Sequence, residues 1–219
     1  MKTAIILGAT GLVGRALVQQ LLQDDRFARV VALVRRDAGI RHPKLSSHIV
    51  NFDGPEEWKH LVSGDVLLST LGTTMKQAGS KEEQYKVDFT YQYEAAKASS
   101  TNGVESYVLV SSAGASPRSR IFYSRMKGEL EEAINKLSFS RVSIIRPGLL
   151  SGHRSEQRTG EKLMIKVMNT LCRIPGLSGY EPIAVSIVAR AMINAYFHQR
   201  EQHRVQELRE VFDLAEGKL

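Results

Sequence analysis

The stretch Gly8-Ala9-Thr10-Gly11-Leu12-Val13-Gly14 decides the fold of this chain. A short apolar run at 3–7 precedes it, and apolar residues at helical spacing follow it across 11–23. Residues 30–34 are apolar throughout, as in a strand that is buried on both faces. The order strand, glycine loop, helix, strand predicts a β-α-β unit within the first 34 residues.

A glycine loop between a strand and a helix is typical of dinucleotide binding. Glycines allow a tight turn and a close approach of the backbone to a pyrophosphate, and the helix N-terminus offers free N–H groups. The alternative is an ordinary strand-to-helix turn, but the surrounding β-α-β unit favours the dinucleotide site. The loop residues that we expect to contact the cofactor are Gly8, Thr10, Gly11, Leu12, Val13 and Gly14.

The alternation of strand-like and helix-like segments continues to about residue 150. Further strands are predicted at 48–51, 66–69, 107–111 and 142–145, and helices at 81–100, 122–136, 161–171 and 185–198. This order predicts an α/β fold with a doubly wound parallel sheet of Rossmann type. We expect a single domain over 1–219, in which 151–219 contributes a small C-terminal lobe on the substrate side of the cleft.

Composition narrows the class of protein further. The 219 residues carry a net charge of +7 and a single cysteine, Cys172, which has no partner for an intrachain disulfide. No apolar run is long enough to span a bilayer, and the N-terminus does not resemble a signal peptide. We therefore expect a cytoplasmic protein without a membrane anchor, whose positive charge favours an anionic partner.

The residues that follow the predicted strands indicate which dinucleotide binds. NAD binders usually place a carboxylate after the second strand, whereas here Arg35 and Arg36 stand at that position. Guanidinium groups pair with the additional phosphate of NADP, so the sequence favours NADP(H). The alternative is a solvated basic strand end with Asp37 as its partner. Ends of later strands should line the same cleft, which adds Asp53, Leu71, Gly72 and Thr73 to the predicted cofactor residues.

Tyr123 and Lys127 are candidates for acid–base chemistry. Their spacing places a phenol and an ammonium on one helix face, where the positive charge favours the phenolate form. Tyr93 and Lys97 repeat the spacing, but no polar strand end lies just before them, so we interpret them as a surface pair. Ser111 and Ser112, in contrast, end the strand before Tyr123.

Together these motifs and Arg146-Pro147-Gly148 resemble the short-chain dehydrogenase/reductase superfamily in its atypical, extended-like branch. The similarity is greatest to Tat-interacting oxidoreductase-like proteins and their bacterial relatives. The resemblance implies that Tyr123 is the acid/base, that Lys127 holds the nicotinamide ribose, and that Ser112 steadies the substrate oxygen. It also places Ser111, Leu150 and Arg158 beside the cofactor or substrate. Lys86-Val87-Asp88 replaces the Asn-Val pair of many extended relatives, so a relay through that asparagine is not expected.

The resulting expectation is an NADP(H)-dependent oxidoreductase that transfers a hydride to or from a small carbonyl or alcohol substrate. The alternative is an NADPH-sensing regulatory or scaffold protein without turnover, because a fold does not determine a function. A nucleotide-sugar epimerase is less favoured, since only about 70 residues remain for a substrate lobe. No metal site, nucleic-acid partner or membrane contact is expected. The apolar face at 163–171 is interpreted as core, substrate lid or protein-partner surface.

Overall fold

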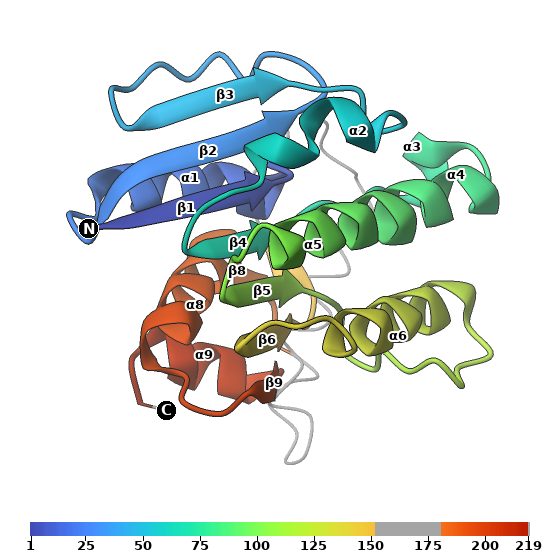
Figure 1. The fold of residues 1–219 in the computed structure, drawn as a ribbon. Helices are drawn as coiled ribbons and strands as arrows, with labels where there is room; N and C mark the ends of the chain where they lie inside the picture. The colour runs from blue at the N-terminus through green and yellow to red at the C-terminus, as the bar shows by residue number, and fades with distance from the viewer. Residues whose placement is uncertain (152–180, 219) are drawn as a thin grey trace.

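The computed structural model describes residues 1–151 and 181–218. Within these residues, seven parallel strands form one sheet in the order β3-β2-β1-β4-β5-β6-β9 (Figure 1). The strands are β1 (Lys2–Leu7), β2 (Phe27–Val34), β3 (Leu45–Ile49), β4 (Val66–Ser69), β5 (Ser106–Val110), β6 (Arg141–Arg146) and β9 (His203–Glu207). The strand order reverses at β1, which pairs with both β2 and β4. This doubly wound sheet confirms the predicted fold class, and ligands of such sheets bind at this reversal point.

Both faces of the sheet are covered by helices, as Figure 1 shows. The first core lies against α1 (Leu12–Gln23), α8 (Val185–His198) and α9 (Arg209–Ala215). The second core lies against α2 (Pro55–Trp58), α5 (Tyr91–Thr101) and α6 (Phe122–Asn135). In β1, Ala4 and Ile6 face the first core, and Ile5 and Leu7 face the second. Burial on both faces explains why residues 4–7 of β1 and 30–34 of β2 are continuously apolar.

The helix predicted at 81–100 is divided into three pieces. They are α4 (Lys81–Tyr85), the π-helical turn η2 (Lys86–Thr90) and α5. Two further short elements are α3 (Met75–Ala78), which contacts α4, and the 3₁₀ turn η1 (Lys59–Leu61), which follows α2. A π turn inserts an additional residue into the hydrogen-bond ladder and is frequently found at functional sites. Here the turn carries Asp88, which is buried.

Residues 181–218 add one strand to the main sheet and two helices to its first core. β9 pairs with β6, and the apolar stripe of α8 is buried against α1 in the first core. The short strands β7 (Leu150–Ser151) and β8 (Ile183–Ala184) pair with each other. The remaining part of the predicted lobe, with Arg158, Cys172 and the 163–171 face, lies outside the described residues.

No helix among the described residues is long and apolar enough to cross a membrane. Across the same residues, no group of three or more His, Cys, Asp or Glu side chains is arranged to hold a metal ion.

Candidate cofactor site and active site

The glycine loop joins β1 to α1 with very close backbone packing. Gly8 has a φ of +82°, and a Cβ on this residue would lie 2.7 Å from the backbone of Thr70 and Leu71. A Cβ on Gly14 would lie 2.0 Å from the carbonyl oxygen of Gly8. A Cβ on Gly11 would meet only that same oxygen, at 3.3 Å. Gly8 and Gly14 are therefore required by packing, while Gly11 leaves open the space in front of the helix N-terminus.

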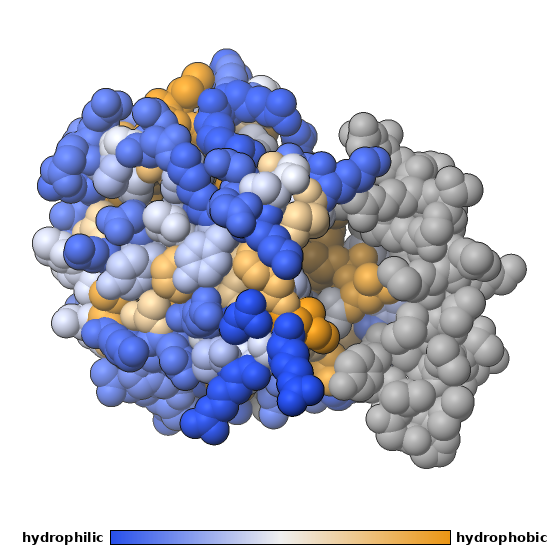
Figure 2. Space-filling model, turned by 90° about the vertical axis from the view of Figure 1, so that its right-hand side faces the viewer, coloured by the Kyte–Doolittle hydropathy of each residue, from blue (hydrophilic) through white to orange (hydrophobic). Residues whose placement is uncertain are grey.

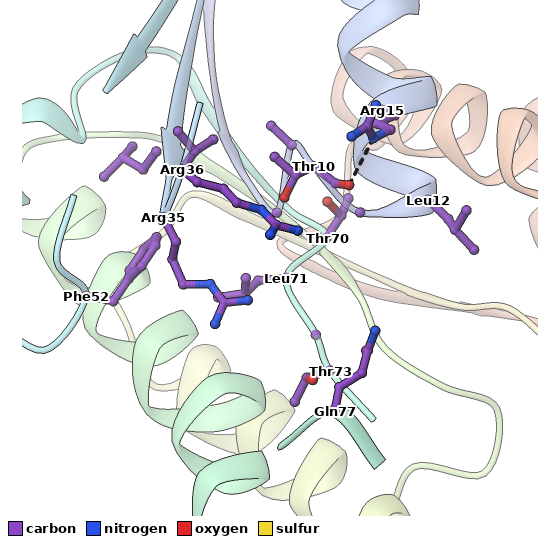
Figure 3. Close-up of a pocket in the computed structure, with 16 residues that line it drawn as sticks. Thr10, Leu12, Arg15, Arg35, Arg36, Phe52, Thr70, Leu71, Thr73 and Gln77 are labelled. Carbon is purple, nitrogen blue, oxygen red and sulfur yellow. Dashed lines mark hydrogen bonds between the residues drawn. The ribbon is translucent and has the colours of Figure 1, made fainter. Parts of the chain in front are cut away.

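A cavity of about 690 Å³ opens above this loop, at the reversal point of the sheet. Its lining comes from the glycine loop, α1, the end of β2 and the segment after β4 (Figure 3). The lining residues are Gly8, Ala9, Thr10, Gly11, Leu12, Arg15, Leu33, Val34, Arg35, Arg36, Phe52, Thr70, Leu71, Gly72, Thr73 and Gln77. The volume is within the usual range for a small-molecule site. We call this cavity the glycine-loop pocket.

Arg35 and Arg36 extend from β2 into the glycine-loop pocket, toward Leu71 and Thr10 respectively (Figure 3). Within residues 1–151 and 181–218, neither guanidinium has an ion-pair partner. Asp37 is not their partner, because its carboxylate pairs with Arg41 at 2.6 Å. Two cations that lack an ion-pair partner within the described part of the chain therefore face a cavity that also contains a helix N-terminus. This environment is suited to phosphate groups.

Asp53 lies beside the glycine-loop pocket and does not line it. Its carboxylate pairs with Lys86 at 2.7 Å and accepts a hydrogen bond from the Tyr91 hydroxyl at 2.8 Å. The Lys86 and Tyr91 hydrogen bonds lower the pKa of Asp53 below its ordinary value. The neighbouring Phe52, which sequence reasoning did not select, contributes the lining at this point.

Lys127 is buried in α6 and pairs with Asp88 of η2. The distance between Lys127 Nζ and Asp88 Oδ1 is 3.0 Å, and the two side chains are 3% and 1% exposed. The second carboxylate oxygen of Asp88 accepts a hydrogen bond of 2.8 Å from the backbone N–H of Thr73. Burial lowers the pKa of Lys127, but attraction to Asp88, Tyr123 and Glu131 outweighs it, so the pKa lies above its ordinary value. Lys127 is therefore a fixed ammonium group.

Tyr123 stands in the first turn of α6 and is 37% exposed. Its ring centroid lies 5.8 Å from Lys127 Nζ. It lines a second cavity of about 400 Å³, which we call the Tyr123 pocket. The residues of the Tyr123 pocket are Thr73, Thr74, Met75, Lys81, Gln84, Ile121, Phe122 and Tyr123. Thr73 lines both cavities, so the Tyr123 pocket adjoins the glycine-loop pocket.

Ser111 and Ser112 differ in their surroundings. The Ser111 hydroxyl is buried and donates to Glu131, which also pairs with Arg146. Ser112 is half-buried, and its hydroxyl makes only a long contact of 3.4 Å with the Ala113 carbonyl. The Ser111 hydroxyl is thus held by Glu131 in the protein interior. The Ser112 hydroxyl, in contrast, has no short hydrogen bond among the described residues.

The loop after Ser112 packs closely on α6. A Cβ on Gly128 would lie 2.3 Å from the backbone of Ser116 and Pro117. The Ser116 N–H also donates to the Ser124 carbonyl at 3.0 Å. These contacts hold the serine loop against the helix that carries Tyr123 and Lys127.

The other predicted residues do not line either pocket, and Val13 is buried in the first core. Leu150 in β7 is half-buried and packs against the first core. Tyr93 stacks on Phe89 with ring centroids 6.0 Å apart, and Lys97 is exposed. Sequence reasoning missed Arg15, Thr70 and Gln77 as lining residues, because no motif marks them. It noted Asp88 only as a departure from Asn-Val, which was the available signal for the partner of Lys127.

Comparison with known proteins identifies the family. The model of a family described as NAD(P)H-binding matches residues 8–170, a range that includes the glycine loop, Tyr123 and Lys127. The chain belongs to this NAD(P)H-binding family. It is 34% identical over 203 residues to the protein fmp52, mitochondrial, of Aspergillus fumigatus, covering 89% of the chain and 87% of that protein. It is 35% identical over 209 residues to FMP52, mitochondrial, of Candida glabrata, covering 92% and 88%.

Solved structures of other proteins share the fold of this chain. WbmH of Bordetella bronchiseptica, in complex with NAD⁺, is 17% identical with a TM-score of 0.71, covering 94% of this chain and 75% of WbmH. The UDP-Glc/GlcNAc 4-epimerase of Campylobacter jejuni is 15% identical with a TM-score of 0.73, covering 97% and 82%. At this level of identity, the similarity establishes the shared fold.

The expected cytoplasmic location is wrong in view of the relatives. The fungal proteins that match nearly the whole chain are named as mitochondrial. The expectation depended on a single cysteine and on the lack of an apolar segment, and a mitochondrial matrix protein has the same two properties.

Proposed function

We propose that this protein is an NADP(H)-dependent oxidoreductase that interconverts a carbonyl compound and an alcohol, with Tyr123 as the acid/base. The observation that carries the proposal is the meeting of the two pockets at Thr73. One pocket combines a glycine loop with two arginines that have no ion pair among the described residues. The other contains Tyr123, whose ring centroid lies 5.8 Å from the Lys127 ammonium group. A hydride donor and a proton donor can therefore act on one substrate from adjoining sites.

The residues present fit a phosphorylated dinucleotide. Gly11 leaves room for a pyrophosphate at the N-terminus of α1, and Arg35 and Arg36 would hold the additional ribose phosphate. Phe52 offers an aromatic surface to the adenine. Thr73, at the other end of the glycine-loop pocket, would border the nicotinamide. When bound, the nicotinamide supplies or accepts the hydride.

The protein's own groups supply the proton and the positive charge. In reduction, the carbonyl C=O becomes C–OH: the carbon gains the hydride, and the oxygen takes the proton of the Tyr123 hydroxyl, which solvent restores. Lys127 stays protonated because Asp88 pairs with it, so its charge favours the transient phenolate. The Ser112 hydroxyl would hydrogen-bond the substrate oxygen. Oxidation uses the same groups in reverse.

Two observations favour a second function, the binding of NADPH as a signal without turnover. Asp88 neutralises much of the Lys127 charge, and Ser111 is hydrogen-bonded to Glu131. Because of these contacts, Lys127 and Ser111 have less charge and fewer free hydrogen-bonding groups available for a reaction. A protein that only senses NADPH would need the glycine loop and the arginines, but not the Tyr123 hydroxyl.

Calorimetry with NADPH and NADH tests the cofactor preference on which the proposal depends. NADPH should bind more tightly, because each arginine can make charge-assisted hydrogen bonds worth about 1.5 to 3 kcal/mol. The double variant Arg35→Ala, Arg36→Ala should lose most of this difference and keep its NADH affinity. Arg41→Ala is the matched control, since Arg41 already pairs with Asp37. Equal affinities of the native protein for NADPH and NADH would contradict the preference.

A further inference from the structure

We propose that the Tyr123 pocket binds an oxo acid, that is, a carbonyl compound with an apolar body and a carboxylate. This inference rests on the proposed function, because it names the substrate class of the same reaction. Three features of the pocket lead to it: its position beside the cofactor cavity, its exposed apolar wall, and two polar side chains, Lys81 and Gln84, that donate to no group among the described residues.

The position of the pocket makes it a substrate site. Thr73 separates it from the glycine-loop pocket, and the Tyr123 ring forms part of its wall. A compound held here therefore lies between the proton donor and the cavity assigned to the cofactor. The volume of about 400 Å³ is within the range of small-molecule sites.

The wall of the pocket requires an apolar body in the substrate. Six large apolar side chains of residues 1–151 and 181–218 are exposed, and three of them line this pocket: Met75, Ile121 and Tyr123. Met75 is 41% exposed and Ile121 is 67% exposed. Figure 2 shows apolar surface between hydrophilic side chains on the face where the strands end. Removal of such surface from water by an apolar ligand is favourable.

Two polar groups in the pocket favour an anion. Gln84 is only 4% exposed, yet within the described part of the chain its side-chain amide donates no hydrogen bond. Lys81 has no ion pair among the same residues, and its Nζ lies 5.7 Å from the Phe122 ring centroid. No Asp or Glu lines the pocket. A carboxylate accepts hydrogen bonds from both an amide and an ammonium group, so it satisfies Gln84 and Lys81 together.

The described lining does not favour a nucleotide sugar. A diphosphate carries two or more negative charges and usually meets several cations or a helix N-terminus. Among the residues of the Tyr123 pocket, Lys81 is the one cation, and the apolar wall offers little to sugar hydroxyls.

The test is calorimetry on the full chain saturated with NADP⁺, so that no turnover occurs. The probes are phenylpyruvate and an oxodecanoate, each paired with its own methyl ester, and UDP-glucose. We expect at least one acid to bind about tenfold more tightly than its ester, because the ester cannot pair with Lys81. Lys81→Met and Gln84→Leu should each remove most of this difference, and Ile121→Asp should weaken acid and ester alike. Lys76→Met, in the neighbouring helix α3, is the matched control and should change nothing.

The outcomes distinguish a failure of the oxo-acid assignment from a failure of the proposed function. NADP⁺ affinity should stay the same in every variant, which also shows that the variant is folded. If the native protein binds neither NADP⁺ nor NADPH, the proposed function fails. If it binds NADP⁺ but the esters bind as tightly as the acids, or no probe binds, the oxo-acid assignment alone is overturned. Tighter binding of UDP-glucose than of every acid overturns it too.

Discussion

At the scale of single residues, the three glycines of the loop have two different roles. Gly14 allows α1 to pack on the strand end, since a Cβ there would overlap the Gly8 carbonyl oxygen at 2.0 Å. Gly11 has no such restriction, because its nearest contact is 3.3 Å away and it lines the glycine-loop pocket. Substitutions can therefore distinguish Gly11, which leaves space for the ligand, from Gly14, which is required for packing of the fold.

Valine substitutions should separate these roles. Gly11→Val is expected to fold but to bind NADPH at least about tenfold more weakly, because the side chain takes the place of the pyrophosphate. Gly14→Val is expected to lower the free energy of unfolding severely through overpacking. Thermal unfolding and calorimetry on both variants check the pair. Normal NADPH binding by Gly11→Val would show that the loop does not hold the pyrophosphate.

The sequence predicted the glycine loop and the two arginines of the site, but not the ion pair of Lys127. The glycine loop, Arg35 and Arg36 could be found because each stands at a fixed position in a β-α-β unit. The ion pair between Lys127 and Asp88 joins residues 39 positions apart in sequence on different helices. No periodicity or motif reports such a contact, which depends on how α6 packs against η2.

At the scale of elements, a polar network joins four parts of the fold behind the serine loop. Glu131 of α6 accepts from Ser111 and pairs with Arg146 of β6. Arg146 also pairs with Glu207 of β9 at 3.3 Å, and Glu207 accepts a 2.7 Å hydrogen bond from the Gly114 N–H. The Arg146 and Glu131 side chains are 20% and 6% exposed, so the network is largely removed from water.

Removal of the central cation should destabilise the protein strongly. Arg146→Leu leaves Glu131 buried without its cation, and we expect the free energy of unfolding to fall by about 3 kcal/mol. Arg204→Leu in β9 is the control, because the exposed Arg204–Glu201 pair is worth at most about 1 kcal/mol. Urea unfolding of the two variants makes the comparison. Equal small losses would mean that the network does not hold these elements together.

The elements that sequence reasoning misplaced have physical explanations. The segment 81–100 keeps helical spacing, but the π turn at Lys86–Thr90 changes the hydrogen-bond pattern without a change in residue type. The polar sequence His-Arg-Val-Gln-Glu of β9 gave no strand signal, since an edge strand is supported by pairing with β6 and not by its own hydrophobicity. Helix α8, in contrast, has the predicted bounds because its apolar stripe is regular.

At the scale of the whole molecule, two buried groups make the free energy of unfolding depend on pH in the alkaline range. Burial raises the pKa of Tyr107, whose hydroxyl has no hydrogen-bond partner among the described residues. The pKa of Lys127 is also raised, since attraction to its neighbours outweighs burial. Both groups keep their protons longer in the folded protein than in the unfolded chain. Their contribution is therefore complete below about pH 10 and is lost as the pH rises beyond it.

The free energy of unfolding should consequently fall above about pH 10. In Tyr107→Phe the fall should be shallower, because one of the two linked groups is gone. At neutral pH this variant should be at least as stable as the native protein, since it removes a buried hydroxyl without a partner. Denaturant unfolding across this pH range provides the measurement. An alkaline fall that is unchanged in Tyr107→Phe would contradict the assignment to Tyr107.

The most direct test of the proposed function measures NADPH affinity and NADPH oxidation on the same Tyr123→Phe preparation. The substitution removes only the phenolic proton donor, and Tyr123 does not line the glycine-loop pocket. We predict unchanged NADPH affinity, while turnover of an accepted carbonyl substrate falls by about a hundredfold or more. Unchanged turnover would remove Tyr123 from the reaction and contradict the proposed mechanism.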